Sequence, residues 1–98
     1  MENKNNPENE LAACRERIDE VDRRLVALFN ERTAIVEQIG QLKKGAQLPV
    51  YEPRREESVY ANVAAANGGP LSTDALQRIF ERIMDEMRKI QRERMVGK

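Results

Sequence analysis

Five polar side chains lie in stretches that otherwise repeat apolar residues at helical spacing, and these side chains are the best placed to do chemistry. They are Arg32, Lys43, Glu52, Glu56 and Gln91. A charged or amide group on a buried face is costly unless an opposite charge or a hydrogen bond satisfies it. The set therefore indicates either structural ion pairs or a polar pocket that binds a charged ligand.

Arg32 and Lys43 are the two positive charges of this set on the first apolar stretch. Arg32 stands between Leu28 and Ile35, and Lys43 follows eleven residues after Arg32. That spacing returns to nearly the same helical angle about 16 Å along the axis, so both side chains can reach toward one anionic ligand. Alternatively, Arg32 sets the register of a coiled coil, and Lys43 interacts with the helix dipole.

A second group of charges lies on the next segment of the chain. Glu52, Arg55 and Glu56 share one helical face with the apolar residues of that segment. A solvated ion-pair face is the alternative interpretation of this cluster. Near the end of the chain, Gln91 continues a row that contains Met87, where an aliphatic side chain would pack better. A frayed, half-exposed helix end explains Gln91 equally well.

Together these residues predict a pocket for a small ligand that carries several negative charges and a hydroxyl group. Its positive charges are Arg32, Lys43 and Arg55, and its acceptors are Glu52 and Glu56. Arg15 is a further candidate. It lies about 25 Å from Arg32 along a helix and about 100° around it, so it cannot serve the same pocket within one chain. In an antiparallel dimer it can reach the partner's pocket.

The element that must position the first of these residues is a long helix. Ten residues recur at alternating three- and four-residue spacing, and we call them the seam: Leu11, Cys14, Ile18, Val21, Leu25, Leu28, Arg32, Ile35, Ile39 and Leu42. Such a seam, held for about four and a half heptads, predicts a helix from Leu11 that ends near Gly45. Residues 1–9 are predicted to form a disordered polar tail.

Two shorter helices are predicted after it. Pro53 suits the first turn of a helix that runs to about Ala66, and the sequence NGGP at 67–70 is a strong stop. Ser72 is a good N-cap for the third helix. The predicted buried stripe of that helix is Leu76, Ile79, Phe80, Ile83, Met87 and Ile90. No strand pattern occurs, so the predicted fold class is all-α.

The length of the first helix has a consequence for assembly. From Leu11 to Lys43 it is about 50 Å long, whereas a globule of about 100 residues has a diameter of roughly 35 Å. Two shorter helices cannot cover the whole seam. A second copy is the simplest cover, so the sequence predicts a homodimer of chains with one long and two shorter helices.

Composition excludes several other classes of function. The 98 residues carry 17 Lys+Arg and 17 Asp+Glu, so bulk attraction to nucleic acid or an anionic membrane is not supported. The chain has no histidine and one cysteine, Cys14, which removes the commonest general base and any thiolate cage for a metal. No apolar signal core or membrane-spanning run occurs, and we expect a cytoplasmic protein.

These features resemble the AroQ-class chorismate mutases, the all-helical type II family. Three segments carry the resemblance, which runs from Leu11 to Gln91: CRERIDEVDRRLVALFNERTAIVEQIGQLKK, LPVYEPRREE and LQRIFERIMDEMRKIQ. The resemblance implies that residues 10–95 form a chorismate mutase domain, intertwined as a homodimer through the long first helix. It also implies an isomerase that converts chorismate to prephenate without a cofactor or metal, in the biosynthesis of phenylalanine and tyrosine by the shikimate pathway.

The resemblance further implies which residues meet the substrate. Arg32 would hold one substrate carboxylate, and the partner's Arg15 would hold the other. Lys43 would contact a carboxylate and the ether oxygen of the breaking C–O bond, and Gln91 would contact that same oxygen.

Glu56 and the region of Glu52 would bind the ring hydroxyl, and Arg55 would shape the pocket. Three positions depart from the family pattern. Met87 stands where some members have a serine that helps bind a carboxylate, Glu52 replaces a shorter aspartate, and Tyr51 replaces an arginine. These departures bear on affinity more than on the type of reaction.

Other interpretations stay open from the sequence. An isochorismate pyruvate-lyase, a relative within the same fold, uses a similar pocket on a similar dianion. A non-catalytic dimerisation or regulatory domain of an aromatic-pathway enzyme and a generic coiled-coil hairpin are alternatives from other classes, although Leu or Ile at position 32 would suit a purely structural seam better than Arg32. A second aromatic-pathway enzyme is a candidate partner.

Overall fold

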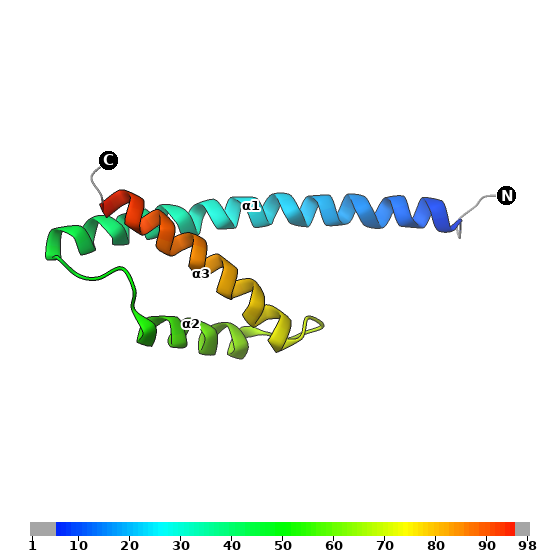
Figure 1. Cartoon of the computed structure of the whole chain (residues 1–98). Helices are drawn as coiled ribbons and strands as arrows, with labels where there is room; N and C mark the ends of the chain where they lie inside the picture. Colours follow the sequence, from blue (N-terminus) through cyan, green and yellow to red (C-terminus); the bar gives the residue numbers. More distant parts are fainter. Residues whose placement is uncertain (1–5, 96–98) are drawn as a thin grey trace. The chain divides into compact units, whose positions relative to one another are not determined.

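The computed structural model describes residues 6–95 and consists of three helices (Figure 1). Helix α1 spans Pro7–Ala46, α2 spans Pro53–Ala66 and α3 spans Thr73–Met95. No strand occurs between residues 6 and 95, so the predicted all-α fold class is confirmed. Within the same residues, no helix is long and apolar enough to cross a membrane.

Helix α1 begins at Pro7, four residues before Leu11, so residues 7–9 of the expected tail are helical. Asn6 acts as the N-cap, because its side-chain Oδ1 accepts a hydrogen bond from the backbone N–H of Glu8 at 2.8 Å. Pro7 occupies the first helical position, and Glu8 and Glu10 lie in the first turn, where negative charge favours the helix dipole. Residues 1–5 of that tail lie outside the described residues.

The chain divides into two compact units between Arg32 and Thr33. In unit 1 the described residues form one helical segment, and every residue from Pro7 to Glu31 is exposed. The large apolar side chains among them include five members of the seam: Leu11, Ile18, Val21, Leu25 and Leu28. These seam residues of unit 1 are therefore not covered by any other part of unit 1.

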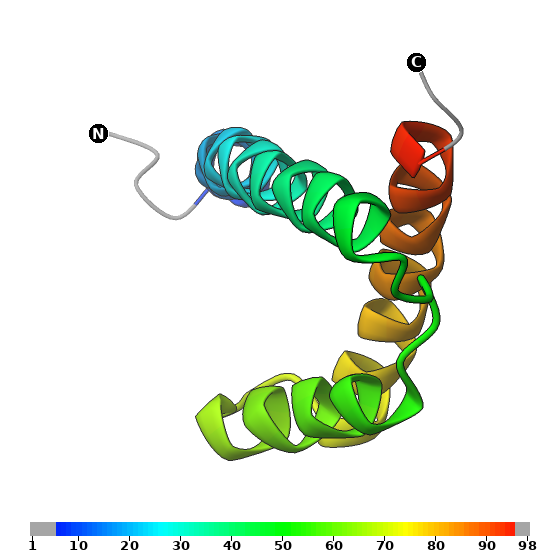
Figure 2. The same cartoon turned by 90° about the vertical axis from the view of Figure 1, so that its left-hand side faces the viewer.

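Unit 2 contains the last turns of α1 together with α2 and α3. Its buried apolar residues are Val36, Val59, Met84 and Met87, drawn from all three helices. Helix α3 runs from the end of α2 back to the last turns of α1 (Figure 2), and so serves both of them. Because α3 packs on two neighbours, its buried surface is wider than the predicted stripe. Met87 is buried as expected, but Met84 is buried in addition and Ile79 is exposed.

The face that α1 turns toward α3 lies one residue away from the seam. Val36, Gly40 and Lys43 are buried, whereas the seam residues Ile35, Ile39 and Leu42 are exposed. Helix α3 comes close to α1 at Gly40, where a Cβ would already be in van der Waals contact with Gln91 at 3.5 Å from its Cα and a longer side chain would have no room. The seam and the intrachain packing face are thus two neighbouring stripes of one helix.

The ends of the three helices are closed by local backbone and cap contacts. The third helix has the predicted cap, in which the Ser72 Oγ accepts the N–H of Ala75 at 3.0 Å. Helix α2 has the predicted bounds, beginning at Pro53 and ending at Ala66. Helix α1 ends after Ala46, where Gln47 takes a positive φ of 59°. The Leu48 N–H then donates to the Lys43 carbonyl at 2.8 Å, which closes the last turn.

The left-handed backbone at Gln47 yields a prediction about stability. Glycine adopts a positive φ without the steric cost that a Cβ brings. We expect Gln47→Gly to be more stable than Gln47→Ala by about 1 kcal/mol, because both variants lose the glutamine side chain and only alanine keeps the strain. Chemical denaturation of the two variants measures the difference. Equal midpoints would show that this backbone geometry costs nothing.

Candidate functional site

The centre of the site is a buried ammonium group on the last turn of α1. The side chain of Lys43 is 8% exposed, and its Nζ has three acceptors in unit 2. It donates to the Val50 carbonyl at 2.9 Å and to Gln91 Oε1 at 3.0 Å, and it pairs with Glu52 Oε1 at 2.8 Å. An ammonium group has three N–H donors, so each of them has a partner. One residue thereby joins α1, the loop after it and α3.

Gln91 is held from two sides. It is buried, which excludes a frayed helix end as the reason for an amide at this position. The close approach of α3 to α1 at Gly40 brings its backbone against the last turns of α1. Since Oε1 accepts from Lys43, the orientation of the amide is fixed, and Nε2 with its two N–H donors faces away from the ammonium group.

Glu52 lies at the start of α2 but does not cap it. It occupies the N-cap position with no side-chain hydrogen bond to the helix, and its carboxylate pairs with Lys43 instead. The Glu52 side chain is 50% exposed, in contrast to Lys43. The pair therefore joins a buried cation to an anion that solvent also reaches.

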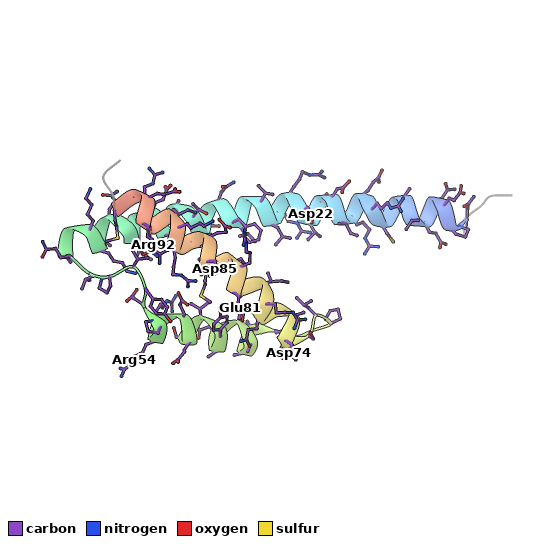
Figure 3. All side chains as sticks on the ribbon, viewed as in Figure 1. Asp22, Arg54, Asp74, Glu81, Asp85 and Arg92 are labelled. Carbon is purple, nitrogen blue, oxygen red and sulfur yellow. The ribbon has the colours of Figure 1, made fainter. Side chains whose placement is uncertain are left out.

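One turn into α2, Glu56 pairs with Arg88 of α3. The Arg88 guanidinium also pairs with Asp85 on its own helix, and it lies over the ring of Tyr51 at 5.8 Å from the ring centroid. Figure 3 shows Asp85 on the stretch of α3 that carries this cluster. Sequence reasoning identified Glu56 and missed Arg88. The available signal was its position beside the buried Met87, which places its stem at the edge of the packed face.

Two pKa values respond to this group of charges. The hydrogen bond that Arg88 donates to Glu56 raises the pKa of Arg88, against the lowering effect of burial, and the charges of Glu56 and Asp85 add to the rise. The guanidinium therefore stays charged at every pH at which proteins fold. Burial is the first cause that raises the pKa of Tyr60, followed by the negative charges of Glu81 and Glu56, so this phenol is neutral at physiological pH.

Arg55 lies apart from both clusters. It is exposed, and its guanidinium donates to the Oγ of Ser58 at 3.1 Å, within its own helix. Its neighbour Arg54 points away from α3 in Figure 3. Arg15 and Arg32 belong to unit 1, where Arg15 is exposed and Arg32 is half-buried. The predicted residues that the structure brings together are thus Lys43, Glu52 and Gln91, with Glu56 held separately by Arg88.

Met87 packs in the core, at the position where the resemblance places a carboxylate-binding serine in some family members. It is buried, and its sulfur accepts a hydrogen bond from the Thr33 hydroxyl at 3.8 Å. A thioether is at best a weak acceptor and no donor, so this side chain offers nothing to a carboxylate.

Chemically, the site combines a buried positive charge, a fixed amide donor and two carboxylates. The ammonium and the amide can stabilise negative charge on an oxygen atom, and each does so without giving up a proton. Residues 14–92 match the family model described as chorismate mutase type II. The chain belongs to this family.

Individual relatives agree with the family assignment. The chain is 33% identical over 79 residues to the bifunctional chorismate mutase/prephenate dehydratase of Aquifex aeolicus, a match that covers 76% of this chain and 22% of that protein. It is 38% identical over 80 residues to the T-protein of Enterobacter agglomerans, a match that covers 79% of this chain and 21% of the relative. The chain thus spans about a fifth of the length of these relatives.

A solved structure extends the likeness to the fold. The form II structure of the chorismate mutase from Thermus thermophilus superposes with a TM-score of 0.83 at 31% identity. The match covers 85% of this chain and 94% of the other. All three helices of the present chain therefore belong to the fold of that protein.

The contact between Gly40 and α3 yields a prediction about how the site is held. An alanine Cβ at position 40 would lie in ordinary contact with Gln91 and Arg94, so we expect Gly40→Ala to be tolerated and up to about 1 kcal/mol more stable through helix propensity. A leucine would force α3 away from Lys43 and destabilise the chain by about 1–3 kcal/mol.

Gly45→Leu is the matched control, because nothing lies within 4 Å of a Cβ at that position. Denaturation midpoints of Gly40→Leu and Gly45→Leu measure the difference. Equal stability of these two variants would mean that the approach of α3 at Gly40 is not required.

Proposed function

We propose that this chain catalyses the rearrangement of chorismate to prephenate, the reaction after which its family is named. The observation that carries the proposal is the buried Lys43–Gln91 pair, in which an ammonium group fixes the direction of an amide donor. The substrate is a dianion with a ring hydroxyl, and the site supplies groups for each of these features.

The reaction needs orientation and electrostatic stabilisation. The ether C–O bond breaks while a C–C bond forms between the enolpyruvyl side chain and the ring, and no proton is transferred. Holding the side chain over the ring lowers the entropic part of the barrier. Negative charge develops on the ether oxygen in the transition state, and donors that are already in place stabilise it there.

Lys43 and Gln91 are the proposed donors to that oxygen. Because Lys43 is buried, its charge acts through a medium of lower dielectric than water, which strengthens the interaction. Because Lys43 occupies Gln91 Oε1, the Nε2 group keeps its N–H donors for the substrate. Neither group has to change its protonation during the reaction.

Substrate binding requires Lys43 to exchange one of its three acceptors. The Val50 carbonyl and Gln91 are anchored in the backbone or in the buried packing of α3, whereas the Glu52 side chain is half-exposed. Moving Glu52 to water therefore costs the least. We propose that the substrate replaces Glu52 at Lys43 and that the ring hydroxyl donates its one hydrogen bond to Glu56, with the released Glu52 carboxylate in the same region of the pocket.

The two substrate carboxylates are assigned to arginines of unit 1. We propose that Arg32 binds one of them and that the partner's Arg15 binds the other, since planar guanidinium groups match carboxylates in a bidentate manner. Arg55 is exposed and bonded within α2, which agrees with a role at the rim of the pocket. These assignments make a complete site depend on two chains.

We further propose that the chain forms a homodimer through the seam of α1. The exposed seam residues are Leu11, Ile18, Val21, Leu25, Leu28, Ile35, Ile39 and Leu42. Contiguous apolar surface of this kind marks an interface. A second copy of the chain presents the same stripe, as a two-fold interface requires.

The proposed activity is tested by mixing the purified chain with chorismate, without added metal or cofactor, and by identifying the product chromatographically. We expect saturable formation of prephenate. Lys43→Ala should lower kcat/KM by about 10²–10³-fold, as for loss of a donor to a developing oxyanion, whereas Lys44→Ala, on the exposed neighbour, should match the parent chain.

Circular dichroism of both lysine variants shows whether they remain helical. Lys43→Met is a second test, because it removes the ammonium group but keeps a side chain of similar volume. Release of pyruvate in place of prephenate would identify the lyase reaction instead. An active, folded Lys43→Ala variant would remove Lys43 from the proposed role.

The shared site is tested by complementation between two inactive variants. Arg15→Ala and Lys43→Ala should each abolish most turnover, but a mixture that has been allowed to exchange subunits should regain activity, because one site of each heterodimer is then intact. Each variant incubated alone through the same exchange is the control. A mixture as inactive as its components would show that Arg15 does not act across the interface.

A further inference from the structure

Arg88 is a half-buried charged residue of unit 2 to which the proposed mechanism assigns no task. It lies on α3 and contacts three separate parts of the fold. One guanidinium nitrogen, Nη1, donates to Glu56 Oε2 on α2, and the other, Nη2, donates to Asp85 Oδ1 on α3. The guanidinium carbon, Cζ, lies over the ring of Tyr51, in the loop before α2, at 5.8 Å from the ring centroid.

These contacts fix both the position and the orientation of the guanidinium group. A planar group that is bonded at two nitrogens, with an aromatic ring within cation–π distance, has little freedom to rotate. Asp85, although more exposed than Glu56, holds the second nitrogen and so sets the direction in which the first one points. The pair with Glu56 is therefore directional.

The pair is also shielded from water compared with another ion pair on the same helix. The side chains of Arg88 and Glu56 are 22% and 20% exposed, whereas those of Arg82 and Glu86 are 75% and 44% exposed. Shielded ion pairs are screened less by salt and contribute more than exposed ones. The rise in the pKa of Arg88 caused by Glu56 agrees with a strong pair.

We propose that Arg88 is a positioning residue for the chorismate mutase reaction: it holds the Glu56 carboxylate in the orientation that accepts a hydrogen bond from the ring hydroxyl of the substrate. This inference rests on the proposed function and names a residue that acts through Glu56. Arg88 donates to Oε2, which leaves Oε1 of the same carboxylate for the substrate. Recognition of the hydroxyl thus depends on α3 as well as on α2.

A double-mutant cycle tests the proposal. The four proteins are the parent chain, Arg88→Met, Glu56→Gln and the double variant, and kcat and KM for chorismate are measured for each. Arg82→Met is the matched control, because Arg82 lies on the same helix and pairs only along it, with Glu86. Circular dichroism and a denaturant midpoint accompany every variant.

We expect Arg88→Met to lower kcat/KM about tenfold, as for loss of one hydrogen bond to a charged group. The change should lie mainly in KM, because the hydroxyl is held alike in the ground state and the transition state. In the Glu56→Gln background the same substitution should cost less than about threefold, since Arg88 then has no carboxylate to orient. Arg82→Met should leave both constants unchanged.

Two further measurements separate positioning from a structural role. Arg88→Lys keeps the charge but has no second nitrogen for Asp85, so it should reverse only part of the rise in KM caused by Arg88→Met; Arg88→Ala replaces Arg88→Met if that variant does not fold. With an analogue of chorismate in which hydrogen replaces the ring hydroxyl, the parent chain and Arg88→Met should have the same KM.

The proposal is overturned if the loss is equal in both backgrounds, or if it is equal for chorismate and the analogue, because Arg88 would then act independently of Glu56. Failure of the proposed function is visible separately, since the parent chain would then form no prephenate. An active parent chain with additive losses contradicts only the role of Arg88.

Discussion

A buried ammonium group must be surrounded by acceptors, and the arrangement of unit 2 follows from how Lys43 meets that requirement. Its partners come from the loop after α1, from the start of α2 and from the end of α3. Each of these segments must therefore be in place before the charge can be buried without a large cost. The lack of a bulky side chain at Gly40 lets α3 come close enough to supply Gln91. Lys43, which is proposed to act on the substrate, is thus also the residue that joins these three segments.

The two charged clusters of unit 2 differ in how firmly they are closed. Around Lys43, one of the three acceptors is half-exposed and can be exchanged for a ligand. Around Arg88, both members of the pair with Glu56 are largely shielded, and the guanidinium also contacts the ring of Tyr51. An exchangeable contact suits a site that must admit an anion, and a closed contact suits a group that must keep its direction. In the proposed mechanism the exchangeable Lys43–Glu52 pair admits the substrate, and the closed Arg88–Glu56 pair keeps one carboxylate in a fixed orientation.

The sequence predicted those features that depend on one helix at a time. Gln91 stood out because it interrupts an apolar stripe on its own helix, and Lys43 stood out because it follows Arg32 at a spacing that returns to nearly the same helical angle. Arg88 did not stand out, because it lies among charged residues and its contact with Glu56 depends on how α2 and α3 cross. The shift from the seam to the stripe of Val36, Gly40 and Lys43 escaped prediction for the same reason, since only the packing of α3 on α1 selects between these neighbouring stripes. The start of α1 was missed although Asn6 carries a capping signal.

The exposure of α1 from Pro7 to Glu31 has a consequence for the thermodynamics of the chain. A helix without tertiary cover is marginal in water, and its stability comes from whatever surface it joins. For a seam that is covered by a second copy, folding of this segment and association become one equilibrium, and the free energy of unfolding contains a term in protein concentration. Dilution then acts on this helix as a denaturant does, and a catalyst whose pocket draws on two chains loses structure and activity together.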